Sequence, residues 1–308
     1  MGKTFPLTKS ENMGIFTPQR KIKSSYNLLK DFDYYLPDIK GLFILLALLI
    51  AGALLGNLVT AGLMLLPGGE GLMSYSMLLS YPVMFIPAML YAASKSKFNR
   101  DFDMERPVPV DQDKFGIGGF LGLAAAVVIV TIAAGFVTDP LSKLLPPTPE
   151  WFDRLNEQML VGTPLWATLL SVSVFAPLFE EWLCRGMILR GLLQRMKPVW
   201  AMVISSLFFA LIHMNPWQAL PAFILGMLFA YVYYRTGSLK LTMLMHCANN
   251  TFAALIGQND KFREMTSYSE IMEPWQYVTL VIAGLFITVV FILILRKNTT
   301  VGNQPMNL

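Results

Sequence analysis

The sequence predicts an all-α membrane protein with about eight transmembrane helices that enclose a polar site. Three observations support this fold class. Of the 308 residues, 55% are hydrophobic and only 14% are charged, which is too apolar for an ordinary soluble domain. Apolar runs of the length needed to cross a membrane recur along the chain. Basic residues fall between these runs in an alternating pattern, as they do in multi-pass proteins.

The apolar runs define the expected domain organisation. We expect a polar tail over residues 1–40, a transmembrane helical domain over 41–296 with a motif core at 165–257, and a second tail over 297–308. The fifth apolar run is too short to cross a membrane alone, so we expect it to end inside the protein. The expected spans cover residues 41–66, 72–94, 115–138, 165–188, 199–213, 218–235, 239–257 and 275–295.

The basic residues predict the orientation of the chain. If both termini are cytoplasmic, all but four of the 24 Lys and Arg residues lie in cytoplasmic segments; the exceptions are Lys143, Arg154, Lys261 and Arg263. Such an excess on the inner side is the rule for multi-pass proteins. We therefore expect a multi-pass membrane protein with both ends in the cytoplasm. The net charge of +4 comes mostly from these segments and does not indicate a nucleic-acid partner.

Two further patterns concern packing and the outer surface. Gly52–Gly56 and Gly118–Gly122 have the GxxxG spacing, which predicts close helix packing at both places. Residues 146–163 repeat apolar side chains at helical spacing beside charged ones. This second pattern predicts a short helix that lies on the outer membrane surface.

The fourth apolar run contains two adjacent carboxylates and an arginine, Glu180, Glu181 and Arg185. A charged group at membrane depth costs roughly 2.5–3.5 kcal/mol on insertion scales, so these groups should be paired or functional. Glu181 and Arg185 are four residues apart on one helix face, in the order that favours an ion pair. Glu180 points about 100° away from Glu181, and it therefore needs a partner from another span.

The chain has two histidines, His213 and His246, and both fall in apolar runs. Counting residues along the antiparallel fourth and fifth runs places His213 at a depth similar to that of Glu180. His213 is therefore the best candidate partner for this carboxylate. Phe209 precedes His213 by four residues, and Asn250 follows His246 by four, so each pair shares a helix face.

A carboxylate, two imidazoles and an amide in a dry pocket suit the hydrolysis of a peptide bond. Glu180 and His213 can hold and deprotonate a water molecule. His246 and Asn250 can donate hydrogen bonds to the oxyanion, and each such donor is worth roughly 3–4 kcal/mol. A second version places one divalent metal, such as zinc, between Glu180, His213 and His246. The HExxH signature of the commonest zinc proteases is absent from the sequence.

These residues together resemble the CPBP intramembrane proteases, a group that includes the CAAX prenyl endopeptidases and bacteriocin-processing or immunity proteins. The motifs that carry the resemblance are Glu180-Glu181-xxx-Arg185, Phe209-xxx-His213 and His246-xxx-Asn250. The resemblance implies a helical membrane fold with about eight spans and a water activated by Glu180 and His213. It also implies that His246 and Asn250 lie at the oxyanion, and that Glu181 and Arg185 support the site. From the habit of the family, we further expect a location in the cell inner membrane.

We therefore expect a CAAX-protease-like intramembrane endopeptidase, a hydrolase acting on a membrane-associated or lipid-modified protein or peptide. The expected partners are membrane lipid and that substrate, and a requirement for metal, which would make it a metalloprotease, stays open. One alternative is a non-hydrolytic binding or immunity protein on the same fold. Another is a transporter that relays protons through buried Glu and His, but the ionisable residues cluster in one half of the chain, whereas transporters are often built from repeats.

Overall fold

The computed structural model describes residues 28–116, 118–151, 154, 163–259, 265 and 267–299. Within them the chain is helical, with no strand. The long helices with α geometry throughout are α1 (Ile39–Met64), α2 (Ser76–Asp101), α3 (Gly119–Thr138), α8 (Pro198–Leu211), α9 (Pro216–Thr236), α10 (Leu239–Gly257) and α12 (Pro274–Asn298). Short 3-10 helices are η1 (Leu28–Phe32), η2 (Gly69–Tyr75), η3 (Asp139–Leu144) and η6 (Tyr268–Glu270).

One further long helix, here called the motif helix, runs from Leu165 to Leu192 and contains the EExxxR sequence. Its winding alternates between α and π geometry. The successive parts are α5 (Leu165–Leu169), π-helical η4 (Leu170–Phe175), α6 (Ala176–Glu181), π-helical η5 (Trp182–Leu189) and α7 (Arg190–Leu192). π-helical turns are rare and occur often at functional sites.

All eight expected spans are helical, which confirms the all-α polytopic membrane fold. In the described chain, six helices are long and apolar enough to cross a membrane: α1, α2, α3 with η3, the motif helix, α9 and α12. The fifth expected span is the short helix α8 of 14 residues, as its sequence predicted. α10 has the required length, but its polar residues, which include His246 and Asn250, make it less apolar than the six.

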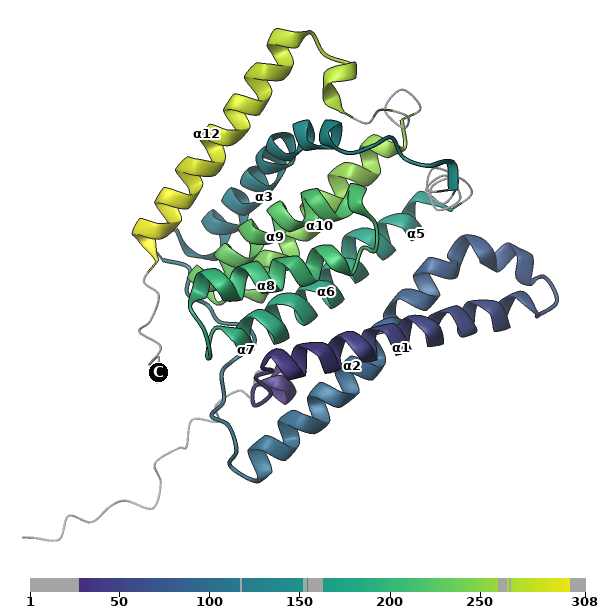
Figure 1. Ribbon diagram of the computed structural model, residues 1–308, viewed down its shortest axis with the longest axis vertical. Coiled ribbons are helices and arrows are strands. Elements are labelled where there is room, and N and C mark those ends of the chain that lie inside the picture. Colours follow the sequence, from purple (N-terminus) through teal and green to yellow (C-terminus); the bar gives the residue numbers. More distant parts are fainter. Residues whose placement is uncertain are drawn as a thin grey trace, which may run out of the picture.

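The helices form a central bundle with two additions (Figure 1). The motif helix, α8, α9, α10 and α3 pack together in the bundle. α12 lies on one outer side and contacts α3. On the opposite side α1 and α2 form an antiparallel hairpin, and α2 contacts η4 and α6 of the motif helix. The bundle therefore surrounds the motif residues, and the hairpin covers them from one side.

The hairpin confirms the packing prediction for one of the two GxxxG pairs. A Cβ added at Gly52 would lie 1.9 Å from the carbonyl oxygen of Met84, and one added at Gly56 would lie 3.0 Å from that of Ser80. The absence of side chains thus lets α1 and α2 approach closely. The prediction was wrong for Gly118–Gly122, because a Cβ at either glycine would meet no described atom within 4 Å.

Residues 28–38, which were expected to end a polar tail, are packed against the bundle. The buried guanidinium of Arg190 donates to the carbonyls of Phe32 and Tyr35, each at 2.8 Å, and to that of Val108 at 2.5 Å. Its Nη1 also lies 3.8 Å from Asp33. Burial raises the pKa of Asp33, and the neighbouring Arg190 charge opposes that shift. Arg190 therefore joins three separate chain segments at one end of the bundle.

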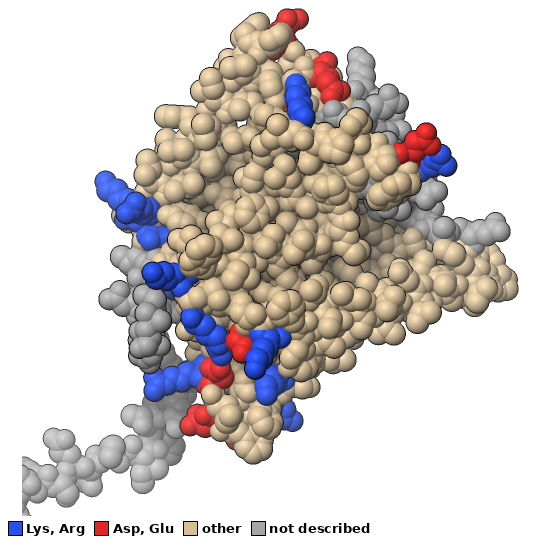
Figure 2. Space-filling model, viewed as in Figure 1, with Lys and Arg blue, Asp and Glu red and all other residues tan. Residues whose placement is uncertain are grey.

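Charged side chains mark the two ends of the helices (Figure 2). Lys and Arg gather along the lower left edge, over the ends of α2, α9 and α12, while the middle of this face carries no charge. This arrangement is that of a membrane-embedded protein whose basic edge lies outside the apolar layer. Of the outer-surface segment 146–163, most residues lie outside the described part of the chain, so the helix expected there stays a prediction.

Candidate active site

Pro177 changes the backbone hydrogen bonding of the motif helix around η4. In η4 the N–H of Ala176 donates to the carbonyl of Ser171, five residues earlier. The same pattern would pair the carbonyl of Val172 with residue 177, but proline has no N–H to donate. The side-chain amide of Asn250 donates to this carbonyl instead, at 2.7 Å. One of the motif residues of α10 is thereby fixed against the motif helix.

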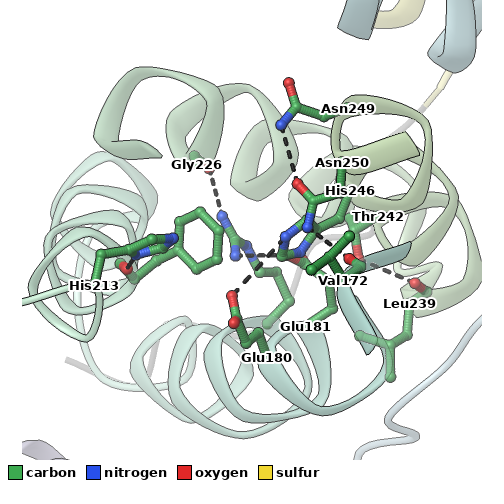
Figure 3. A network of polar contacts seen from close by, with 12 residues as sticks. Val172, Glu180, Glu181, His213, Gly226, Leu239, Thr242, His246, Asn249 and Asn250 are labelled. Carbon is green, nitrogen blue, oxygen red and sulfur yellow. Dashed lines mark hydrogen bonds and ion pairs between the residues drawn. The ribbon is translucent and has the colours of Figure 1, made fainter. Parts of the chain in front are cut away.

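Glu181 and Arg185 form the expected ion pair, and it is fully buried. Arg185 Nη1 donates to Glu181 Oε1 at 2.9 Å, and both side chains have 0% exposure. The same carboxylate oxygen lies 3.1 Å from Nδ1 of His246. Arg185 Nη2 donates to the carbonyl of Gly226 in α9 at 2.9 Å. One pair therefore connects the motif helix to α10 and to α9 (Figure 3).

Aromatic rings replace water around the Arg185 guanidinium. Its Cζ lies 4.5 Å from the ring centre of Phe209 and 5.5 Å from that of Phe229. A desolvated cation gains about 2 kcal/mol or more from such a face. Gly226 makes room for the group, because an added Cβ would lie 3.2 Å from Arg185 Nη2 and 3.2 Å from Phe209. Phe209, expected to support the site, lies with its ring against this guanidinium.

His246 is oriented by Glu181 and faces Glu180. An ionised carboxylate only accepts hydrogen bonds, so Nδ1 of His246 is the donor to Glu181, and Nε2 is the nitrogen turned to the other glutamate. Nε2 lies 3.9 Å from Glu180 Oε2. That oxygen is buried and has no hydrogen-bond partner among the described residues. A separation of this size between polar groups is commonly bridged by water.

The expected pairing of Glu180 with His213 is not found. No hydrogen bond or ion pair in the described part of the chain joins the two side chains, and Figure 3 shows His213 to one side of the cluster. Its Nδ1 donates to the carbonyl of Phe209 at 2.7 Å. The depth count assumed an unbroken helix, but α8 ends at Leu211 and the following turn has φ 53° at Met214. His246 is the imidazole beside Glu180.

The Phe209 ring lies between the two imidazoles. Its centre is 5.1 Å from that of His213 and 5.4 Å from that of His246, and both contacts are edge-on. The three candidate metal ligands, Glu180, His213 and His246, therefore do not converge. More generally, the described residues contain no group of three His, Cys, Asp or Glu side chains placed to hold a metal ion. This donor set does not fit a three-ligand metal site.

Sequence reasoning missed three residues that complete the site. The hydroxyl of Tyr81 in α2 donates a hydrogen bond to Oε1 of Glu180. Gly226 supplies a carbonyl to Arg185, and Val172 supplies one to Asn250. Pro177 was the available signal for the Val172 carbonyl. A tyrosine within the second apolar run was the signal for Tyr81, but nothing in the sequence pairs it with residue 180.

Two comparisons with known proteins found similar sequences. Residues 162–252 match the family model described as Type II CAAX prenyl endopeptidase Rce1-like. The chain is also 27% identical over 190 residues, 59% of its length and 74% of the other's, to the Bacillus subtilis (strain 168) protein named "Putative membrane peptidase YdiL". No solved structure matches. The resemblance to CAAX-type membrane endopeptidases is thereby confirmed over the region that carries all three motifs.

Proposed function

We propose that this protein is an intramembrane endopeptidase that hydrolyses a peptide bond of a membrane-associated or lipid-modified protein or peptide. One observation carries the proposal most directly. Glu180 is buried, one of its carboxylate oxygens has no partner among the described residues, and that oxygen faces His246 at 3.9 Å. Glu181 also has one buried oxygen without a partner among the described residues, so the feature that sets Glu180 apart is the imidazole that its unpaired oxygen faces.

In the proposed mechanism, Glu180 is the general base. A water held between Glu180 Oε2 and His246 Nε2 loses a proton to Glu180 while its oxygen attacks the carbonyl carbon of the substrate. The tetrahedral oxyanion then collapses as the carbon–nitrogen bond breaks. Glu180 returns the proton to the leaving amine, so the reaction consumes one water and regenerates the carboxylate. No metal takes part in these steps.

The remaining motif residues have supporting roles in this proposal. Glu181 and Arg185 hold the His246 ring, because Nδ1 is bonded to Glu181. Asn250 uses one N–H on the Val172 carbonyl, which leaves its second N–H for the oxyanion. A role for His213 in the same reaction requires the turn after α8 to bring its ring past Phe209.

The membrane setting supports the substrate class and the location. The helices present apolar side chains to their surroundings, so a substrate with a lipid chain or a transmembrane segment can approach within the membrane. The distribution of Lys and Arg supports cytoplasmic termini, and the resemblance to CAAX-type membrane endopeptidases supports a location in the cell inner membrane. Membrane lipid and a hydrophobic or lipid-modified peptide are the proposed partners.

The deciding experiment compares peptide termini in membranes from cells that carry the natural protein, Glu180→Gln or Glu105→Gln at matched abundance. Glu105 forms a partly exposed ion pair with Arg195 at 2.8 Å, far from the cluster in sequence, so it controls for the loss of a carboxylate. New termini should appear with the natural and Glu105→Gln proteins and be missing with Glu180→Gln. Mass spectrometry of the termini would also identify the substrate.

Two outcomes would count against the proposal. Identical termini in all three membranes, over several growth conditions, would favour the non-hydrolytic binding or immunity protein. Cleavage that survives Glu180→Gln would show that another group is the base. Once a substrate is known, a chelator added to the purified protein should leave its cleavage rate unchanged, because the candidate donors do not converge.

A further inference from the structure

The α1–α2 hairpin lies outside the region that matches the family model, yet it contributes directly to the cluster. The hydroxyl of Tyr81, near the start of α2, donates to Oε1 of Glu180, 99 residues later in the chain. This is the only hydrogen bond recorded for the Glu180 carboxylate within the described residues. The two carboxylate oxygens are therefore in different environments, one bonded to a phenol and the other facing an imidazole.

A column of aromatic rings holds Tyr81 in place. The ring of Tyr81 lies 5.6 Å from that of Phe85, one helical turn further along α2. Phe85 is fully buried and stacks on Phe179 of α6, with 5.2 Å between ring centres and 15° between planes. Phe179 directly precedes Glu180. The positions of the Tyr81 phenol and the Glu180 carboxylate are thus fixed by the same row of ring contacts between α2 and the motif helix.

α1 packs against this part of α2 on a neighbouring face. The close approaches at Gly52 and Gly56 bring the backbone of α1 against Met84 and Ser80, the residues that flank the Tyr81 turn. Pro82 removes the N–H that would have bonded the carbonyl of Leu78, yet α2 stays α-helical through this position. The hydroxyl is therefore carried by a helix segment that packs against α1 on the face next to Tyr81.

We propose that Tyr81 is a positioning residue for the reaction: its hydroxyl holds Oε1 of Glu180 so that Oε2 is presented to the water and to His246. This inference rests on the proposed function. A phenol suits the task because it donates one hydrogen bond and stays neutral, so it restrains the carboxylate without cancelling its charge. An arginine in the same place would pair with Glu180 and weaken it as a base, as Arg185 pairs with Glu181.

The test compares Tyr81→Phe with Tyr91→Phe, the same change on the same helix at a residue whose ring contacts Tyr35 rather than the cluster. With the substrate identified from membrane termini, Tyr81→Phe should lower kcat by about 100-fold, the typical effect of misplacing a reacting group. KM should stay within about twofold, because the substrate itself does not touch the phenol. Tyr91→Phe should change neither quantity.

A second measurement needs no substrate. The probe is dicyclohexylcarbodiimide, an apolar reagent for buried carboxyl groups, and its attachment to Glu180 is followed by mass spectrometry. Removing the phenol should raise the labelling rate of Glu180 by about tenfold, because one hydrogen bond to a charged group is lost. Tyr91→Phe should label as the natural protein does.

The outcomes separate this inference from the proposed function. Unchanged labelling and unchanged kcat in Tyr81→Phe would overturn the positioning role while leaving Glu180 as the base. A fall in kcat that merely follows a fall in folded protein would assign Tyr81 to packing. If membranes with the natural protein contain no peptide termini beyond those found with Glu180→Gln, and the same holds for Glu105→Gln, the proposed function fails, and a labelling change in Tyr81→Phe would then report only a structural hydrogen bond.

Discussion

The motif helix and α12 are both long enough to span a membrane, but their surroundings differ. In the most apolar stretch of the motif helix 61% of the residues are buried inside the protein, against 17% for α12. The Lys and Arg residues of α12 lie only beyond its apolar part, at Arg296 and Lys297, and the helix contains no Asp or Glu. The hydroxyl groups of Thr279 and Thr288 bond to carbonyls of its own helix, at 2.7 and 2.8 Å.

The motif helix, by contrast, places charged groups against other helices. Its pair Glu181–Arg185 reaches α9 and α10, and Val172 accepts from α10. The difference teaches that protein neighbours, and not lipid, make charges tolerable at membrane depth. Substitutions in the motif helix should therefore lower both the unfolding free energy and the cleavage rate, and those on α12 should change either quantity little.

The largest effect is expected from Arg185→Ala. Breaking a buried ion pair leaves an uncompensated charge on Glu181, so the free energy of unfolding should fall by about 3–5 kcal/mol. Denaturant titration in mild detergent measures it. Arg100→Ala is the control, because Arg100 pairs with Asp101 at 3.1 Å on the exposed surface and should cost less than about 1 kcal/mol. Equal losses in the two variants would contradict the comparison.

A smaller effect is expected from Gly226→Ala. The new methyl group would crowd Arg185 and Phe209, each 3.2 Å away, and overpacking of this kind costs about 2 kcal/mol. Cleavage should also fall, since the guanidinium braces Glu181. Gly122→Ala in α3 is the matched control, because its Cβ would meet no described atom within 4 Å. If Gly122→Ala lowers the unfolding free energy as much as Gly226→Ala does, the loss in Gly226→Ala cannot be assigned to crowding of Arg185 and Phe209.

Asn250→Ala should cost about 1 kcal/mol of unfolding free energy, because the Val172 carbonyl loses its donor. Cleavage should decrease by a larger factor than stability predicts, since the amide is also a proposed oxyanion donor. Asn249→Ala serves as the neighbour control: Asn249 donates to Asn250 Oδ1 at 3.1 Å but not to Val172. Thermal unfolding and initial cleavage rates of both variants decide the matter.

The smallest effect is expected on α12. Phe286 is 68% exposed on the described surface, where it would face lipid as apolar as itself. Phe286→Ala should change the unfolding free energy by less than about 0.5 kcal/mol and leave cleavage untouched. A loss comparable to that of Gly226→Ala would mean that this face of α12 is covered by protein.

Much of the fold could be predicted from the sequence because apolar runs and basic connections report the membrane directly. The Glu181–Arg185 pair was also predictable, since both residues lie on one helix at a fixed spacing. The partner of Glu180 was not. That assignment depends on where α8 ends. Counting residues along a helix does not predict the turn that places His213 away from Glu180.

Contacts between distant segments were equally hidden. Tyr81 meets Glu180 from a part of α2 that packs closely against two glycines of α1, and Asn250 meets the carbonyl of Val172, which Pro177 leaves without a backbone donor. Each of these contacts requires the three-dimensional arrangement of two or three helices. Spacing along the sequence can identify candidate site residues, but it cannot predict which residues of different helices contact one another.

Arg190 also has a consequence for the order in which the chain is made. Its guanidinium holds the carbonyls of Phe32 and Tyr35, 158 and 155 residues earlier. Ribosomes add about 5–20 residues per second, so the segment before α1 waits roughly 8–30 s for the side chain that anchors it. Until then the α1–α2 hairpin enters the membrane without its final attachment. Insertion of the motif helix therefore brings Glu180 and Glu181 into the membrane and, through Arg190, attaches the segment that precedes α1.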